Sequence, residues 1–349
     1  MAWRLSRHMK ASVEARIRAA ALTNFFDVSR DLGLDPQPLL RQVGLRRAEL
    51  DDPDKWIPAA ACVALLEAAA TTTGCETFGL RMAESRRLSS FGPLSLLISL
   101  QPTVRAALLT TIQYRDLINE SVALLLEDVG QTAIIRQEVI ANTPCRQATE
   151  LAIGVVFRLC RGGLGTHWRP VSVNFAHLAP ADTQVHWRIF GCPLAFGSEL
   201  NGIVCRSTDL DAPNPNADLA MARYAQRFVD MLPRLRGRNV SHDVRCAITL
   251  MLPMGKANSE SVAEALALSV RTMQSRLDEA GESFSGILNE VRCELASRFV
   301  ENTDYSMLHV AQLLGYTSAS AFSRWFSTQF GMPPIERRAQ RSVPTPRGI

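Results

Sequence analysis

The chain has 349 residues, of which 47% are hydrophobic, enough to bury a substantial core and to form two or more domains. No stretch approaches 18 uncharged apolar residues, which argues against a transmembrane helix, and the basic N-terminus lacks the apolar region of a secretory signal. The net charge is only +4, and residues 239–349 hold 11 Lys and Arg against 11 Asp and Glu, so bulk charge alone does not indicate a nucleic-acid-binding protein.

The first part of the chain begins with a basic segment and continues with helical patterns. Residues 1–20 carry five Lys and Arg against one Glu and are interpreted as a leader to the first helix, with a basic amphipathic helix on a membrane surface as the alternative. Beyond them, apolar residues recur three and four positions apart in several stretches, which predicts helices within 22–34, 59–72, 102–118 and 146–160.

Strand patterns alternate with these helices. Two short apolar runs in 121–140 flank Asp128-Val129-Gly130, which predicts a β-hairpin. The segments 171–177 and 200–207 are also typical of strands. This region is therefore predicted to be an α+β domain of roughly 220 residues, close to the largest size that one core supports.

Two breaks in the pattern indicate the domain organisation. The segment LDAPNPNAD (210–218) is a loop by composition, and MLPRLRGRNVSH (231–242) places Pro, Gly and three arginines between two helical patterns. We place the domain boundary at the second break, with 219–232 as a connecting helix. The predicted division is a basic leader at 1–20, an effector-binding or dimerisation domain at 21–232, a linker at 233–241, an all-α domain at 242–340 and a tail at 341–349.

The C-terminal region contains an internal repeat. Comparing 259–281 with 307–331, three groups of residues match at an offset of 48: Val262-Ala263, Leu266 and Arg276 in the first copy with Val310-Ala311, Leu314 and Arg324 in the second. In each copy a short helix carries an alanine that permits close packing and a leucine three residues later on the same face. No strand pattern occurs in 240–340, so this domain is predicted to be helical throughout.

Each copy has the features of a helix-turn-helix. A short turn, at Leu268-Ser269 in one copy and at Gly315-Tyr316-Thr317-Ser318 in the other, is followed by a second helix for which Ser269 or Ser318 is a suitable N-cap. The apolar positions of the second helices lie four apart and form one inward stripe: Met273 and Leu277 in the first, Phe322 and Phe326 in the second. One helix-turn-helix match is a weak signal, but two at matching positions, joined by one long helix at about 284–302, are a strong one.

This arrangement resembles the DNA-binding domain of the AraC/XylS family of bacterial transcription regulators. The most specific segment is G-Y-x-S-x-S-x-F-S-R-x-F-x-x-x-x-G-x-x-P, carried by Gly315, Tyr316, Ser318, Ser320, Phe322, Ser323, Arg324, Phe326, Gly331 and Pro334. The family usually ends in P-x-x-[YW]-R, whereas this chain has Arg337 at the aromatic position. A weaker resemblance, to the effector-binding and dimerisation region of one branch of the family, is carried by segments 89–108, 169–182 and 190–218.

The resemblance implies two recognition helices, at 269–280 and 318–329, whose N-terminal halves approach base edges in the major groove. Arg271, Gln274 and Ser275 face outward on the first and are expected to contact bases, with a solvated helix face as the alternative. Arg276 and Arg324 are expected to contact phosphate, with pairing to an acidic neighbour as the alternative, and Thr272 is expected to contact phosphate through its hydroxyl. The full set of predicted DNA-binding residues is Ser269, Arg271, Thr272, Gln274, Ser275, Arg276, Ser318, Ala319, Ser320, Ser323 and Arg324.

The sequence contains no set of residues at the spacing typical of a catalytic or a metal-binding site. Thr143-Pro144-Cys145-Arg146 approaches the Pro-Cys-His-Arg motif of alkylguanine transferases, but the histidine is missing, and Cys145 is interpreted as structural. None of the eight cysteines forms a CxxC, and the histidines do not lie at zinc-ligand spacing beside them. Scattered thiols are typical of a reducing compartment, so we expect a cytoplasmic protein without a cofactor or a bound metal.

The leading hypothesis is a sequence-specific transcription regulator, an activator, controlled by a small organic effector bound in the N-terminal domain. The family resemblance indicates a carboxylate or another catabolic metabolite as effector. The expected partners are operator DNA with two boxes about one helical turn apart, RNA polymerase and a second copy of the chain. The alternatives are a regulator whose N-terminal domain only dimerises or binds a protein, and an enzyme with a DNA-binding appendage.

Overall fold

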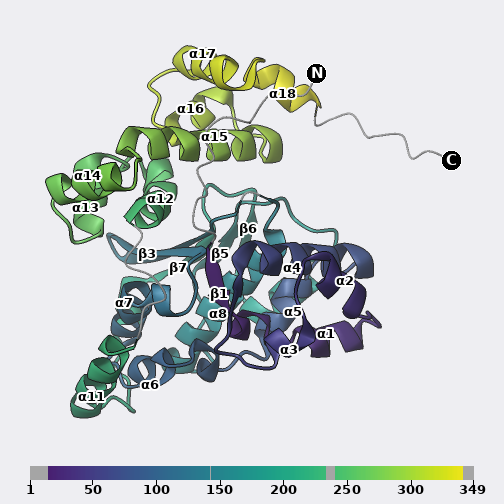
Figure 1. Ribbon diagram of the computed structural model, residues 1–349, viewed down its shortest axis with the longest axis vertical. Coiled ribbons are helices and arrows are strands. Elements are labelled where there is room, and N and C mark those ends of the chain that lie inside the picture. The colour runs from purple at the N-terminus through teal and green to yellow at the C-terminus, as the bar shows by residue number, and fades with distance from the viewer. Residues whose placement is uncertain (1–14, 142, 233–239, 341–349) are drawn as a thin grey trace. The chain divides into compact units, whose positions relative to one another are not determined.

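The computed structural model describes residues 15–141, 143–232 and 240–340, and the chain divides into two compact units (Figure 1). The described part of the first unit comprises 15–122, 139–141, 143–168 and 210–232; that of the second comprises 123–138, 169–209 and 240–340. Most of the predicted leader and linker, and the whole predicted tail, therefore lie outside the described residues. The predicted fold class is confirmed: a sheet with helices occurs in the N-terminal part, and 240–340 is helical throughout.

The first unit is mainly helical. Its elements are β1 (Arg16–Arg18), η1 (Ala19–Leu22), α1 (Phe25–Asp31), α2 (Gln37–Gln42), α3 (Arg47–Leu50), β2 (Trp56–Pro58), α4 (Ala59–Thr73), α5 (Phe78–Glu84), η2 (Leu88–Phe91), α6 (Leu94–Ser99), α7 (Val104–Gln113), η3 (Arg115–Leu117), α8 (Arg146–Leu164) and α11 (Leu219–Asp230). The helices expected within 22–34, 59–72, 102–118 and 146–160 are confirmed as α1, α4, α7 and α8. The connecting helix expected at 219–232 is confirmed as α11.

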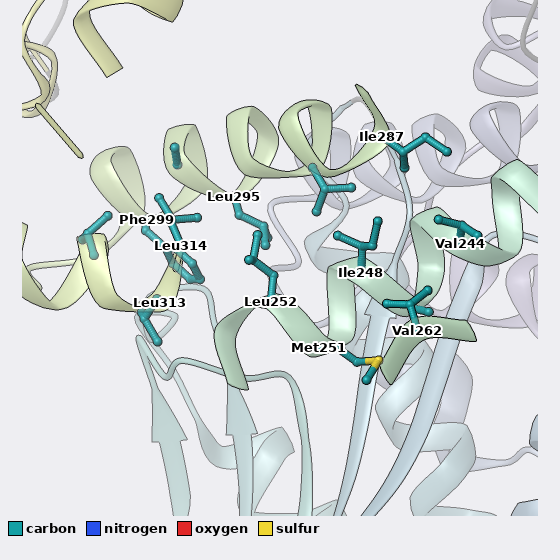
Figure 2. Close-up of a cluster of buried hydrophobic side chains, with 14 of the residues drawn as sticks. Val244, Ile248, Met251, Leu252, Val262, Ile287, Leu295, Phe299, Leu313 and Leu314 are labelled. Atoms are coloured by element: carbon teal, nitrogen blue, oxygen red, sulfur yellow. The ribbon is translucent and has the colours of Figure 1, made fainter. Parts of the chain in front are cut away.

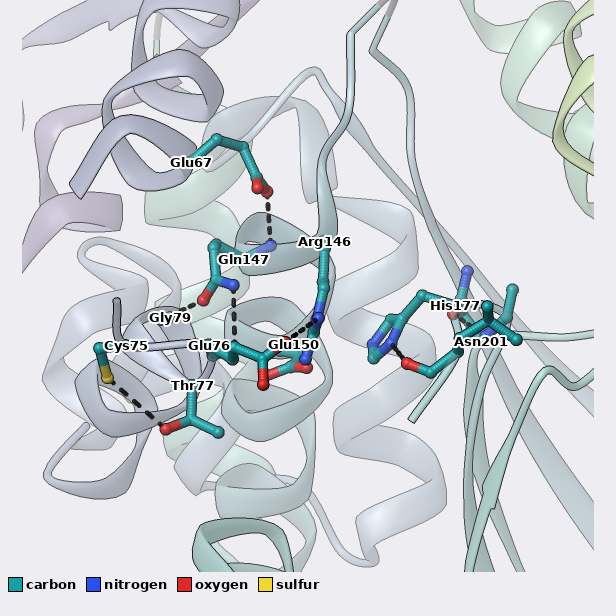
Figure 3. Close-up of polar contacts among 12 residues, drawn as sticks. Glu67, Cys75, Glu76, Thr77, Gly79, Arg146, Gln147, Glu150, His177 and Asn201 are labelled. Carbon is teal, nitrogen blue, oxygen red and sulfur yellow. Dashed lines mark hydrogen bonds and ion pairs between the residues drawn. The ribbon is translucent and has the colours of Figure 1, made fainter. Parts of the chain in front are cut away.

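The long helix α8 lies against α5 and is held there by its second residue. The Gln147 backbone N–H donates to Glu67 Oε1 at 2.6 Å, and its side-chain amide donates to the Glu76 carbonyl at 2.9 Å (Figure 3). In return, the Gly79 N–H donates to Gln147 Oε1 at 3.0 Å. The buried side-chain amide of Gln147 thus has a hydrogen-bond partner for its nitrogen and another for its oxygen. Leaving such a buried amide unpaired would cost about 1–3 kcal/mol of stability.

The last residues of the predicted leader are part of the fold. Arg16–Arg18 (β1) pairs antiparallel with Trp56–Pro58 (β2), and Ile17 opposite Ile57 is buried. The Arg18 side chain is 4% exposed and forms an ion pair with Asp54. Burial lowers the pKa of this guanidinium, which the charge of Asp52 partly offsets.

The second unit contains a five-stranded sheet in the order β3-β4-β7-β5-β6. Its strands are β3 (Val122–Val129), β4 (Thr132–Val139), β5 (Ser172–Phe175), β6 (Leu194–Phe196) and β7 (Gly202–Arg206), with α9 (Gln184–Phe190) and α10 (Ser207–Leu210) between or after them. The predicted hairpin is confirmed as β3 and β4, which turn through Gly130 at φ 63°. The strands predicted within 171–177 and 200–207 are confirmed as β5 and β7, and β4 pairs antiparallel with β7.

The helices of the second unit surround one apolar core. They are α12 (Val240–Met251), η4 (Leu252–Met254), α13 (Ser259–Ala265), α14 (Val270–Glu279), α15 (Phe284–Asn302), α16 (Met307–Leu313), α17 (Ala319–Phe330) and α18 (Pro334–Gln340). Figure 2 shows Val244 and Ile248 of α12 pointing toward the long helix α15, which supplies Leu295 and Phe299 to the same cluster. The repeated residues Val262-Ala263 and Val310-Ala311 are all buried in this core.

Polar contacts join the sheet and the helices inside this unit. Arg298 of α15 donates from both terminal nitrogens to the Glu138 carboxylate of β4, at 2.7 and 3.3 Å, and the Asn201 amide donates to both oxygens of that carboxylate at 3.2 Å. Glu138 is 7% exposed, so these donors compensate a buried charge. A partly exposed ion pair, Lys256 with Glu127 at 3.1 Å, adds a second contact.

Candidate nucleic-acid interface

The two halves of the internal repeat fold alike. Each consists of a short helix, a tight turn and a longer helix: α13 with α14, and α16 with α17. The bounds of α13 and α16, Ser259–Ala265 and Met307–Leu313, differ by 48 residues at both ends, the offset expected from the sequence. Two helix-turn-helix motifs are therefore present in this part of the chain, joined by α15.

Serine side chains begin both longer helices. Ser269 Oγ accepts from the Thr272 N–H at 3.0 Å, and Ser318 Oγ accepts from the Ala321 N–H at 3.2 Å, so both N-cap predictions are confirmed. The shorter helices are capped in the same way by Asn258 and Ser306. These two caps were not predicted, although Asn or Ser directly before a helical pattern is the ordinary N-cap signal.

Both turns begin with a residue in the left-handed conformation. Gly315 has φ 80°, as expected for a glycine in the turn, and Ala267, 48 residues earlier, has φ 53°. In both turns the next residue donates its N–H back to the first helix: Leu268 to the Ala263 carbonyl at 2.9 Å, and Tyr316 to the Ala311 carbonyl at 2.8 Å. Ala267 therefore holds the left-handed conformation that glycine adopts at lower cost.

This difference predicts opposite effects of two substitutions. Ala267→Gly should stabilise the C-terminal helices by up to about 1 kcal/mol, because the left-handed strain of Ala267 outweighs the extra freedom that glycine gives the unfolded chain. Gly315→Val should destabilise them by about 1–3 kcal/mol, since a β-branched residue is strained at this φ. Urea unfolding of both variants measures the free energies, and changes of equal sign would contradict the shared turn geometry.

The second turn is one residue longer than the first, which corrects one match made from the sequence. The buried residues of the longer helices, Met273 and Leu277 against Phe322 and Phe326, are offset by 49, as are the two serine caps. The pairing of Arg276 with Arg324 at an offset of 48 is therefore wrong. The added residue, Thr317, rotates the second helix by one position, so Ser275 is the structural counterpart of Arg324.

The predicted DNA-binding residues lie on the outward faces of α14 and α17. On α14 and at its cap, Ser269, Arg271, Gln274, Ser275 and Arg276 are exposed, and Thr272 is partly buried with its hydroxyl 2.8 Å from Ser269 Oγ. On α17 and at its cap, the exposed residues are Ser320 and Arg324, and the partly buried ones are Ser318, Ala319 and Ser323.

The outward arginines are not engaged by acidic neighbours. Within 15–141, 143–232 and 240–340, no hydrogen bond or ion pair involves the side chains of Arg271, Arg276 or Arg324. Arg276 and Arg324 thus have no acidic partner among these residues, which leaves the alternative of acidic pairing without support there. Three guanidinium groups on the outer faces of the two helices are left to solvent or to a ligand.

The aromatic residues around Arg324 are packing residues. Phe322 and Phe326 are fully buried, whereas Trp325 covers the side of α17, with its ring 5.4 Å from that of Tyr316. The Trp325 indole N–H donates to Asn289 Oδ1 of α15 at 3.1 Å, which fixes α17 on the long helix. At Arg337, where the related family has an aromatic residue, the guanidinium pairs with Glu301 of α15 at 2.7 Å.

Three cysteines have shifted pKa values; Cys62 and Cys192 are buried, and Cys293 is partly buried. Burial raises the pKa of Cys62 to about 12 and those of Cys192 and Cys293 to about 11, so these thiols are weak nucleophiles at neutral pH. Cys145 is partly buried and accepts from Thr149 Oγ1 at 3.8 Å.

Among the described residues, no helix has the length and apolarity needed to cross a membrane.

Comparisons with known proteins agree with this geometry. Residues 33–214 match the family described as the arabinose-binding domain of AraC transcription regulator, N-terminal, and residues 262–340 match a helix-turn-helix domain. The HTH-type transcriptional regulator VirS of Mycobacterium tuberculosis is 26% identical over 94% of this chain and 97% of its own length. The ornithine utilization regulator of Pseudomonas aeruginosa is 22% identical over 89% of this chain and 93% of its own.

Among solved structures, that of the transcriptional regulator CdpR from Pseudomonas aeruginosa aligns with 90% of this chain and 98% of its own, at 17% identity and a TM-score of 0.43. The family assignment itself depends on the two sequence matches, which together cover most of the chain. With an arabinose-binding-type domain followed by two helix-turn-helix motifs, the chain belongs to the AraC family of DNA-binding transcriptional regulators.

Proposed function

We propose that α14 and α17 enter two successive major grooves on one face of operator DNA and that the chain regulates transcription from that site in response to a small effector. The observation that supports this most is the pair of capped helices whose outer faces carry exposed Arg271, Arg276 and Arg324, with no hydrogen bond or ion pair to their side chains from the described residues. An α-helix fits the major groove with its N-terminal half nearest the base edges. These arginines supply the donors that such contacts need.

On α14 we assign base contacts to Arg271 and Gln274. Both lie in the first half of the helix and are exposed, and their side chains suit bidentate contacts with guanine and adenine, respectively. Arg276 lies farther along the helix, where phosphate is the nearer target. Ser269, Thr272 and Ser275 have short hydroxyl side chains suited to phosphate contacts or to a thymine edge.

On α17 we assign DNA contacts to Ser318, Ala319, Ser320, Ser323 and Arg324. Only Arg324 has a long side chain, and its counterpart on α14 is Ser275, so the two helices present different chemistry to DNA. We therefore expect the box contacted by α17 to tolerate more base changes than the box contacted by α14. Phosphate neutralisation by the arginines would make binding steeply salt-dependent.

Replacement of Arg271 tests the base assignment. Arg271→Ala should lower affinity by about 1–3 kcal/mol at one box and relax base preference there, while the other box keeps its selectivity. Arg276→Ala, at another exposed position of the same helix, is the matched control and should weaken binding to all sequences alike. Binding selection with randomised boxes measures both effects. If Arg271→Ala also weakens every sequence equally, Arg271 does not contact a base.

Footprinting of genomic fragments with the full-length protein at two salt concentrations tests the proposal as a whole. We expect a protected site with two boxes about 10–10.5 bp apart, centre to centre, and a strong loss of protection at higher salt. The neighbouring genes then indicate candidate effectors. Salt-sensitive binding without a preferred site would contradict sequence-specific regulation.

We further propose that the N-terminal domain binds a small organic metabolite, a carboxylate or another apolar acid, and that the protein acts as an activator with RNA polymerase in the cytoplasm. The related Pseudomonas aeruginosa regulator is named for ornithine utilisation, which supports a catabolic role. Binding must favour one arrangement of the protein over another in order to alter transcription. A true effector should raise the melting temperature with its concentration, whereas a domain that only dimerises or binds a protein partner would show no such shift.

A further inference from the structure

An arginine of the long helix α15 holds the turn of the second helix-turn-helix. Arg292 donates from Nε to the Leu314 carbonyl at 3.1 Å, and its guanidinium carbon lies 5.5 Å from the centre of the Tyr316 ring. Between them, a Cβ atom on Gly315 would lie 3.5 Å from Arg292 Nη2. Leu314 is the C-cap of α16, where carbonyl oxygens lack helical partners and a nearby cation is favourable. One side chain of α15 thus contacts three consecutive residues at the start of the turn.

Further contacts lead from this turn through α17 and back to α15. The Tyr316 ring lies 5.4 Å from the Trp325 ring, and the Trp325 indole N–H donates to Asn289 Oδ1 at 3.1 Å. Asn289 and Arg292 are three residues apart and therefore share a face of α15. We call Arg292, Tyr316, Trp325 and Asn289 the turn clamp. Because Trp325 directly follows Arg324, the turn clamp also fixes the direction in which Arg324 leaves α17.

The first motif has an apolar residue where the second has this arginine. The helices that precede the two motifs, α12 and α15, match at the offset of 48 found for the short helices. Four buried residues of α15 correspond in this way to four buried residues of α12: Val291, Leu295, Ala296 and Phe299 to Asp243, Ala247, Ile248 and Met251. The same offset pairs Arg292 with Val244, which is fully buried and has no side-chain donor. The arginine contact therefore belongs to the motif whose turn contains the additional Thr317.

We propose that Arg292 is a positioning residue for DNA recognition, which fixes α17 relative to α15 and so sets the distance between the two DNA boxes that the chain accepts. The inference rests on the proposed function, since it concerns how α17 meets its box. Arginine suits this role because its planar guanidinium donates to a carbonyl while it lies over an aromatic ring. Arg292 is partly buried beside the turn and acts through Tyr316 and Trp325, without a DNA contact of its own.

A series of DNA duplexes tests this role with the full-length protein. Each duplex carries the two boxes found by footprinting, at the natural spacing or with one base pair more or less between them. One base pair moves the second box by about 3.4 Å and turns it by about 35°. The wild type should therefore bind the altered duplexes about tenfold more weakly or worse, since a displaced box loses at least one base contact.

Arg292→Ala should bind the natural spacing about tenfold more weakly, the loss expected for one charge-assisted hydrogen bond, and should discriminate little between the three spacings. Tyr316→Leu should have the same effect, because it removes the ring through which Arg292 acts. Arg292→Lys keeps a cation over this ring and should restore part of the discrimination, and Tyr316→Phe keeps the ring and should retain it. If Arg292→Ala weakens binding at every spacing by one common factor, Arg292 only stabilises the fold, and the proposal is wrong.

Salt dependence separates positioning from a direct phosphate contact. The slope of log affinity against log salt concentration should be equal for the wild type and Arg292→Ala. A slope smaller by about one in the variant would mean that Arg292 itself neutralises a phosphate, which overturns the proposal. A wild type without a two-box site removes the proposed function and this inference with it. A wild type with such a site, beside an Arg292→Ala variant of unchanged spacing preference, removes the inference alone.

Discussion

Phe326→Ala is expected to destabilise the C-terminal helices by about 3–5 kcal/mol, the usual cost of truncating a buried phenylalanine. Phe326 is fully buried, and its ring stacks on Phe330 at 4.2 Å between centroids and meets Phe322 edge-on at 5.6 Å. The cavity would lie beneath α17, which would lose its fixed position on α15. Urea unfolding of the full-length protein, followed by an α17-sensitive probe such as Trp325 fluorescence, measures the loss.

The same substitution has a functional consequence that can be separated from global unfolding. At low temperature, where the rest of the chain stays folded, the DNA box assigned to α17 should lose protection before the box assigned to α14. Thr328→Ala is the control, because Thr328 is exposed on the same helix and its hydroxyl only donates to the Arg324 carbonyl at 2.9 Å. Equal loss at both boxes would mean that the two motifs fold as one cooperative element.

The C-terminal helices could be predicted well from the sequence because their signals are local. The spacing of Met273 and Leu277, or of Phe322 and Phe326, fixes which side of each helix is buried, and a serine just before the helix supplies its N-cap. The outward residues follow from the same periodicity, so their exposure needs no knowledge of the tertiary structure. The long helix α15 was predicted at 284–302 and observed at Phe284–Asn302 for the same reason.

The turns could not be predicted from local sequence signals. Sequence identity aligned Arg276 with Arg324, although the N-caps and the buried residues of the second copy are shifted by one position after Thr317. The left-handed conformation of Ala267 could not be predicted from the sequence, because alanine normally avoids this conformation. Only the equivalent place of Gly315 in the second copy indicates that this turn requires a positive φ.

Elements that depend on distant partners were also missed. The strand β1 lies in a segment interpreted as a leader, and its pairing with β2 joins residues about 40 positions apart. The short helices α3 and α5 were not predicted, and α5 is held by its packing on the longer helices α8 and α4. The sheet of the second unit likewise combines β4 with β7, which are far apart in the sequence.

The packing of α5 on α8 depends on a glycine that no periodicity reveals. A Cβ atom on Gly79 would lie 2.1 Å from the Gln147 carbonyl oxygen and 2.8 Å from its carbon, and both belong to the backbone of α8. Because backbone atoms cannot move aside as a side chain can, the two helices would have to separate. The hydrogen bond from the Gly79 N–H to Gln147 Oε1 would be strained with them.

Gly79→Ala should therefore destabilise the N-terminal unit by about 3 kcal/mol, at the upper end of the cost of overpacking, and lower its melting temperature by roughly 10 °C. Gly162→Ala on α8 is the matched control: nothing lies within 4 Å of its Cβ position, so the better helix propensity of alanine should stabilise the unit by about 0.5–1 kcal/mol. Calorimetry of both variants compares the same substitution in a close helix contact and in open space. A neutral Gly79→Ala would show that α5 and α8 do not approach each other so closely in solution.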